Sequence, residues 1–142
     1  MAARDGTSVY FNATAVALDG RGALFLGPSG SGKSATALGL IAHGAQLISD
    51  DGVWLKGDLL VSPDKAPDLI EARGIGLINS GPRCASAEIA LVAILGQVED
   101  KRLPPRRFTT TPDENVPLIR VASTPTLVPA LLQILRHGLA ET

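Results

Sequence analysis

A glycine-rich segment, "GPSGSGKS" at residues 27–34, restricts the possible folds of this chain more than any other feature. It follows a short apolar run at residues 23–26 and precedes residues 34–44, whose apolar positions lie on one side of a helix. The pattern G-x-x-x-x-G-K-[ST] belongs between a strand and a helix, and both are predicted here. The segment therefore predicts a strand–loop–helix unit of an α/β domain.

The same segment, called the cradle from here on, predicts a binding site for a nucleotide phosphate of the Walker A type. Its glycines let the backbone turn tightly and direct successive N–H groups at one anion. Lys33 reaches the outer phosphates, Ser34 offers its hydroxyl to Mg²⁺, and the helix points its positive end at the anion. The alternative is a plain glycine-rich turn, which the strand before it and the helix after it disfavour. The cradle consists of Gly27, Pro28, Ser29, Gly30, Ser31, Gly32, Lys33 and Ser34.

Further apolar runs, bounded by turn residues, have the length of strands. They lie at residues 14–18, 45–49, 53–55, 59–61, 87–95 and 116–121. Residues 124–138 predict a helix at the end of the chain, and Pro129 leaves its first residue undefined. Residues 68–79 resist assignment because two glycines interrupt them, and residues 97–115, rich in proline and arginine, predict a mobile loop. We expect one α/β phosphate-loop domain over residues 1–142, with a mixed sheet and flanking helices.

Composition narrows the classes of function. The formal net charge of −1 disfavours a nucleic-acid binder that works by bulk charge. The longest apolar run, residues 89–95, is far shorter than the roughly twenty residues that cross a membrane. The single cysteine, Cys84, cannot form an internal disulfide. We therefore expect a soluble, cytoplasmic protein with neither nucleic acid nor membrane as a partner.

Two neighbouring aspartates follow the predicted strand at residues 45–49. Paired aspartates at a strand end are often a solvated turn. Asp50 and Asp51, however, end the strand that comes directly after the cradle helix. Ligands of open α/β sheets bind at the carboxyl ends of strands, so both carboxylates should face the phosphates. One could serve Mg²⁺ while the other accepts a proton from an attacking hydroxyl.

Glu71 and Arg73, in "EARGIGLIN", also allow two interpretations. Two opposite charges at this spacing usually form a surface salt bridge. The two glycines that follow suggest instead a tight backbone turn beside a ligand. The residues alone do not decide between these alternatives.

The cradle, the Asp-Asp pair and the segment "EARGIGLIN", in this order, resemble the HPr kinase/phosphorylase family. The likeness covers residues 14–103 and continues more weakly through "VPLIRV". The cradle with its nearby aspartates is also similar to the nucleotide site of phosphoenolpyruvate carboxykinase, whose fold core that family shares. The resemblance implies a single HPr kinase-like catalytic domain, as in the short forms of the family.

The resemblance also implies an activity. It implies an ATP- and Mg²⁺-dependent kinase that phosphorylates a serine of HPr, the phosphocarrier of the phosphotransferase system, or of an HPr-like protein. It implies the reverse phosphorylase reaction and a homo-oligomer, a hexamer. Asp50 would accept the serine proton, and Ser34 and Asp51 would serve Mg²⁺. Glu71 would support the metal site and Arg73 would help to order it.

Two further positions follow from the resemblance. Arg102 falls where the family has an arginine on a flexible loop near the transferred phosphate, where it would offset charge. Asn12 stands where the family has a histidine just upstream of the cradle strand. It either hydrogen-bonds a turn or marks altered catalysis. Two rival functions therefore remain open, namely a nucleotide-binding regulatory module with impaired turnover and a small-molecule kinase.

Overall fold

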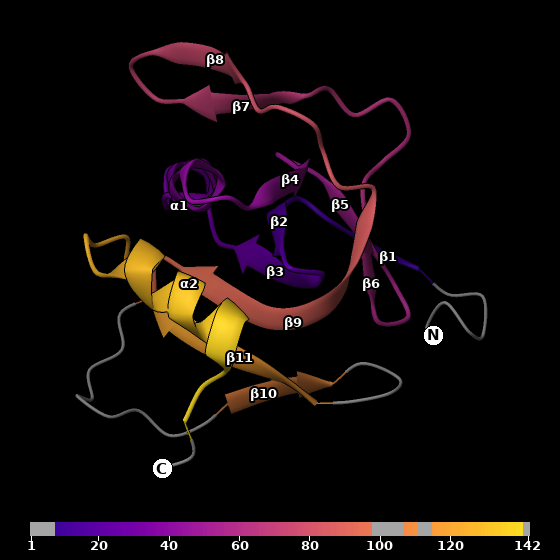
Figure 1. The fold of residues 1–142 in the computed structure, drawn as a ribbon, viewed down its shortest axis with the longest axis vertical. Helices are drawn as coiled ribbons and strands as arrows, with labels where there is room; N and C mark the ends of the chain where they lie inside the picture. Colours follow the sequence, from indigo (N-terminus) through magenta and orange to yellow (C-terminus); the bar gives the residue numbers. More distant parts are fainter. Residues whose placement is uncertain (1–7, 98–106, 111–114, 141–142) are drawn as a thin grey trace.

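The computed structural model describes residues 8–97, 107–110 and 115–140. Within these residues, nine strands form one sheet, and a separate hairpin of two strands lies above it (Figure 1). The large sheet consists of β1 (Val9–Phe11), β2 (Thr14–Leu18), β3 (Arg21–Leu26), β4 (Gln46–Ser49), β5 (Val53–Lys56), β6 (Leu59–Val61), β9 (Ser86–Leu95), β10 (Arg107–Thr110) and β11 (Asn115–Val121). The mixed α/β class predicted from the cradle is confirmed.

The sheet is organised around β9. Its strand order is β1-β5-β6-β9-β3-β2-β4, and β11 pairs with β9 and with β10. The first residues of β9 pair antiparallel with β6, and its last residues pair parallel with β11. Strands β3, β9 and β11 are parallel, so their carboxyl ends meet at one edge of the sheet. The cradle leaves from that edge, directly after β3.

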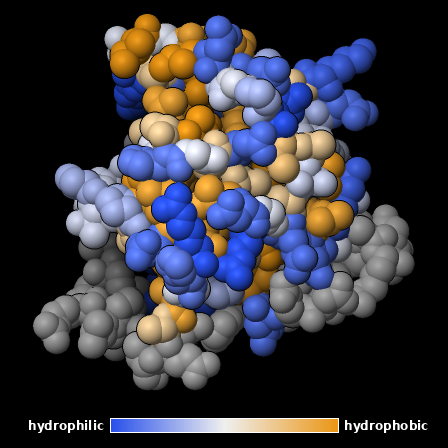
Figure 2. Space-filling model, in the orientation of Figure 1, coloured by the Kyte–Doolittle hydropathy of each residue, from blue (hydrophilic) through white to orange (hydrophobic). Residues whose placement is uncertain are grey.

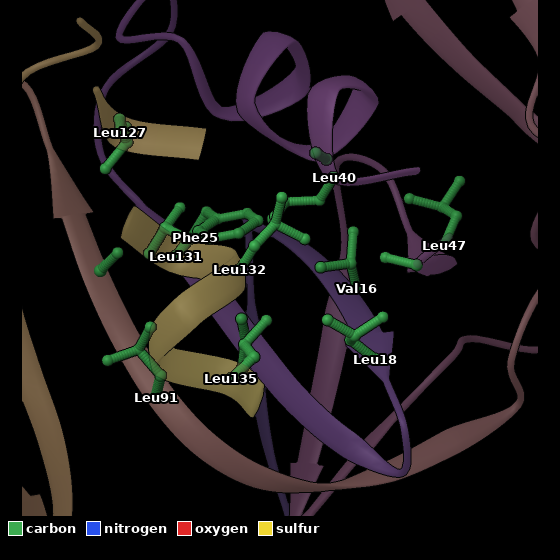
Figure 3. Close-up of a cluster of buried hydrophobic side chains, with 14 of the residues drawn as sticks. Val16, Leu18, Phe25, Leu40, Leu47, Leu91, Leu127, Leu131, Leu132 and Leu135 are labelled. Atoms are coloured by element: carbon green, nitrogen blue, oxygen red, sulfur yellow. The ribbon is translucent and has the colours of Figure 1, made fainter. Parts of the chain in front are cut away.

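Helices α1 (Lys33–Ala42) and α2 (Leu127–His137) cover one face of the sheet. Figure 3 shows Leu131, Leu132 and Leu135 of α2 pointing toward Phe25 and Val16 of the sheet. A second cluster of buried residues covers the opposite face. Because both faces are buried, the central strands are continuous apolar runs, as the sequence suggested.

The segment at residues 68–79 forms a hairpin, which the sequence did not reveal. Strands β7 (Leu69–Ala72) and β8 (Gly76–Asn79) pair antiparallel, and α1 lies between this hairpin and the sheet (Figure 1). The base of the hairpin is anchored by Ile70, which is fully buried. Its far end exposes Ile75 at 81% and Leu77 at 70%, and Figure 2 shows hydrophobic residues gathered there, at the top of the view. The hairpin is thus held through the buried side of β7, where Ile70 and Ala72 lie, while its tip is exposed.

The loop predicted for residues 97–115 is wrong over residues 107–110. These residues form β10, which pairs antiparallel with β11. The backbone pairing with a partner strand outweighs the weak local signal of this short segment. Strand β1 also lacked a local signal and is defined by its pairing with β5. Residues 98–106 and 111–114 lie outside the described residues.

In the described part of the chain, no helix has both the length and the apolar character needed to span a membrane.

Candidate active site

The cradle adopts a backbone that only glycine accepts easily at three positions. Gly27, Gly30 and Gly32 have φ values of 143°, 84° and 102°, all on the positive side. The N–H of Ser31 donates to the carbonyl of Pro28 at 3.1 Å, which closes the turn. Helix α1 begins immediately afterwards, so its amino end faces the cradle.

The surroundings leave no room for larger residues at two of these glycines. An ideal Cβ on Gly27 would lie 2.6 Å from the carbonyl oxygen of Leu95, at the end of β9. An ideal Cβ on Gly32 would lie 2.9 Å from Cβ of Ser123, which follows β11. Residues at the ends of the two parallel strands, β9 and β11, therefore lie in close contact with the cradle. Ser123 carried no recognisable motif, and its position follows only from the pairing of β11 with β9.

Lys33 folds back over the cradle. Its Nζ donates to the carbonyl of Gly27 at 2.5 Å and to that of Pro28 at 3.4 Å. The ammonium group is thereby held above the cradle, where an outer phosphate could take the place of these carbonyls. The role predicted for Lys33, contact with the outer phosphates, stays a prediction.

Asp50, in the Asp-Asp pair, forms hydrogen bonds with the two other predicted motifs, the cradle and the segment "EARGIGLIN". Its Oδ1 accepts a hydrogen bond of 2.8 Å from Oγ of Ser34 and one of 3.0 Å from Oγ1 of Thr14. Its Oδ2 accepts a hydrogen bond of 3.2 Å from the backbone N–H of Glu71. One carboxylate therefore joins the first turn of α1, the start of β2 and the β7–β8 hairpin. Thr14 was not singled out from the sequence, because it carries no motif of its own.

Asp51 occupies a different environment. It is exposed and has a positive φ of 65°, which non-glycine residues rarely adopt. The next residue, Gly52, donates its N–H to the carbonyl of Ala13 at 2.8 Å. The hydroxyl of Tyr10 occupies the space that a side chain at position 52 would need. The turn after β4 is thus fixed from both sides, which directs Asp51 toward solvent beside Asp50.

The β7–β8 hairpin brings Glu71 and Arg73 to the cradle. Glu71 is an exposed residue between two buried ones, and its backbone N–H donates to Asp50. The guanidinium of Arg73 lies against Gly30, since its Nη2 would be 3.4 Å from an ideal Cβ there. Among the residues that the structure describes, no ion pair joins Glu71 to Arg73. Of the two alternatives, the geometry favours the turn beside a ligand.

Of the two remaining predicted positions, Asn12 and Arg102, the structure describes only Asn12. Asn12 is exposed and lies between β1 and β2, next to Ala13 and close in sequence to Thr14. It therefore belongs to the segment whose next residues contact Gly52 and Asp50. Arg102 lies outside the described residues.

The donor set around Asp50 fits Mg²⁺. This ion is usually bound through one or two carboxylates, with water and substrate phosphates completing its coordination. A hydroxyl and a carboxylate lie 2.8 Å apart beside the cradle in Ser34 and Asp50, and Asp51 is adjacent. No cluster of three or more His, Cys, Asp or Glu side chains occurs in the described ranges. The site thus suits an ion that arrives with a nucleotide.

A hollow of the described surface lies away from the cradle. It has a volume of about 350 Å³ and is lined by Arg21, Glu88 and Asn115, at the opposite ends of the parallel strands. None of the cradle residues lines this hollow.

Comparison with known proteins identifies the family. A family model described as HPr Serine kinase C-terminal domain matches residues 6–99, which include the cradle, both aspartates and the hairpin. The chain belongs to this family. The expectation drawn from the three motifs is thereby confirmed.

Individual relatives agree with this result. HPr kinase/phosphorylases of Bacillus cytotoxicus and Bacillus cereus are 48% identical to this chain over 65 residues. That match covers 42% of this chain and 21% of each relative. The structure of the Hpr(Ser) kinase/phosphatase from Coxiella burnetii superposes with a TM-score of 0.72 at 27% identity. The superposition covers 92% of this chain and 89% of the other.

Proposed function

We propose that this chain is an ATP- and Mg²⁺-dependent protein serine kinase that acts on HPr or on an HPr-like carrier. The observation that carries the proposal is the position of Asp50, which contacts Ser34 of the cradle and the backbone of Glu71. Phosphoryl transfer needs a positioned base beside a bound phosphate chain, and little covalent chemistry from the protein. The curated relatives, of whose length the match spans about a fifth, are named for the same activity.

Each residue has a proposed task. The N–H groups of the cradle and the ammonium of Lys33 bind the outer phosphates of ATP. Asp50 accepts the proton of the acceptor serine while the serine oxygen bonds to the γ-phosphorus. The bond from this phosphorus to its bridging oxygen breaks, and ADP leaves. Arg73, which lies against Gly30, and Arg102 offset negative charge on the transferred group.

Ser34 and Asp51 hold Mg²⁺ in this proposal, and Glu71 supports the metal site. When bound, the ion neutralises charge on the phosphate oxygens. A second assignment deserves a test because Ser34 contacts Asp50 directly. In that assignment Asp50 is the carboxylate on the metal side, and Asp51 accepts the serine proton. Substitution of each aspartate separates the two assignments.

A regulatory module that binds nucleotide without turnover is the second candidate. It is favoured by Asn12, which has no titratable proton and lies two residues before Thr14, which contacts Asp50. The lysine, the hydroxyl and both carboxylates that transfer requires are nevertheless present around the cradle. We therefore rank this candidate below the kinase.

The decisive experiment incubates the protein with γ-labelled ATP, Mg²⁺ and HPr proteins. We expect label on a serine of HPr, and none with the Lys33→Ala variant. Calorimetry with ATP and Mg²⁺ accompanies this assay. Nucleotide binding without transfer to any carrier protein would favour the regulatory module. Transfer to a small molecule would favour a small-molecule kinase. Sedimentation would test the proposed homo-oligomer, a hexamer.

A further inference from the structure

Arg83 joins three segments, two of which lead directly into the candidate site. Its Nε lies 2.6 Å from Oδ1 of Asp68, immediately before β7. Its Nη1 donates to the carbonyl of Ile48 at 3.3 Å and to the hydroxyl of Ser62. The Arg83 side chain is only 20% exposed, whereas Asp68 is 64% exposed. A planar guanidinium with several donors can bind three partners in this way, which an ammonium cannot do in the same geometry.

The contacts with Ile48 and Asp68 lie where the chain leads into the aspartates and into the hairpin. Ile48 is in β4, two residues before Asp50. Asp68 forms the base of the hairpin, where its carbonyl accepts the N–H of Ser80 at 2.9 Å. From this base, β7 carries Glu71, whose N–H bonds to Asp50. Arg83 therefore bridges the end of β4 and the root of the hairpin.

We propose that Arg83 is a positioning residue, which holds the β7–β8 hairpin against the end of β4. By this contact it keeps the N–H of Glu71 on Asp50 and the guanidinium of Arg73 on the cradle. The tip of the hairpin is exposed, so its orientation depends on the packing of β7 against α1 and on the contacts at the base. The effect on catalysis rests on the proposed function, whereas the effect on the hairpin does not.

A purely structural role is the competing explanation. The backbone next to Arg83 covers the edge of β4, because Cys84 N–H donates to the carbonyl of Leu47 at 2.9 Å. Gln46 reaches the carbonyl of Pro82 from the same edge. These bonds do not use the guanidinium. A partly exposed ion pair also adds little to stability by itself. Loss of the Arg83 side chain should therefore change the geometry of the site more than the stability of the fold.

The test compares Arg83→Met, Arg83→Lys and Asp68→Asn, with Arg136→Met as the control. Arg136 is exposed in the last turn of α2, away from the site. The first measurement is the backbone amide of Glu71 by NMR, in the protein without nucleotide. We expect its resonance to shift and its hydrogen exchange to accelerate about tenfold or more in Arg83→Met. Asp68→Asn should act in the same direction, Arg83→Lys should act partially, and the control should match the wild type.

The second measurement is the transfer of phosphate to HPr. Arg83→Met should lower kcat about tenfold or more, because a displaced hairpin disturbs the reacting geometry. Calorimetric affinity for ATP should change far less. An unchanged Glu71 amide and kcat in both Arg83→Met and Asp68→Asn would overturn the inference, even if the melting temperature fell. If the wild type does not phosphorylate HPr, the proposed function fails, and the Glu71 amide still decides the role of Arg83. If Arg83→Met does not fold, Asp68→Asn provides the same test.

Discussion

The hydroxyl of Ser34 donates a 2.8 Å hydrogen bond to Oδ1 of Asp50, which joins the first turn of α1 to the residue after β4. Both residues were predicted to belong to the site, but in different tasks. A carboxylate in contact with this hydroxyl can be the proton acceptor or can share a metal ion with it. The first prediction therefore concerns the separate roles of the two aspartates.

Asp50→Asn should leave ATP bound and lower the transfer rate on the order of a hundredfold or more, because an amide cannot accept the serine proton. Asp51→Asn should instead raise the Mg²⁺ concentration needed for half-maximal activity. Steady-state kinetics at several Mg²⁺ concentrations measures both effects. If the two variants exchange these behaviours, Asp50 is the metal carboxylate and Asp51 the base.

Lys33→Ala should weaken ATP binding and abolish transfer, since the outer phosphates lose a point-charge contact. The ammonium lies over the carbonyls of Gly27 and Pro28, which accept weaker bonds than a phosphate would. Titration calorimetry with ATP and Mg²⁺ measures the loss. Arg136→Ala, in the last turn of α2, is the control. Equal ATP affinity in Lys33→Ala and wild type would remove the assignment of the cradle.

Gly27→Ala should destabilise the fold by about 2 kcal/mol or more, because it adds a steric clash to an unfavourable φ. An ideal Cβ there meets the carbonyl oxygen of Leu95 at 2.6 Å. Gly76→Ala is the matched control, because Gly76 has a similar positive φ, 134°, but nothing lies within 4 Å of its ideal Cβ. Urea unfolding of both variants separates the clash from the backbone strain. Equal losses of stability would mean that the contact with β9 is not rigid.

Asn12→His should raise the reverse reaction more than the forward one. An imidazole gains and loses a proton between pH 5 and 8, whereas asparagine only donates and accepts hydrogen bonds. In the reverse reaction a phosphate attacks a phosphoserine, so a nearby imidazolium would offset more negative charge. The wild type should be a weak phosphorylase, with a flatter kinase pH profile near neutrality than the variant. Rates in both directions from pH 6 to 8.5 test this, and identical profiles would make position 12 structural.

Much of the site was predictable because its signals are local. Three glycines, a lysine and a serine at fixed spacing specify a turn and a helix start, and the structure has both. The strand before them and the aspartates after β4 follow from short apolar runs. The β7–β8 hairpin escaped prediction because a buried residue, Ile70, stabilises it by packing against α1, a contact that no local pattern signals. Strand β10 escaped because its partner, β11, provides its hydrogen bonds.

The sequence by itself determined the chemistry available to this protein, because the residue types and spacing of the cradle and the aspartates can be recognised without the structure. Only the tertiary structure decided how that chemistry is arranged. It brought Asp50 to Ser34 and to the backbone of Glu71, put Arg73 against Gly30, and made Arg83 the link between β4 and the hairpin. These contacts join segments separated by many residues. Their formation depends on strand order and on burial of both faces of the sheet, which no local pattern encodes.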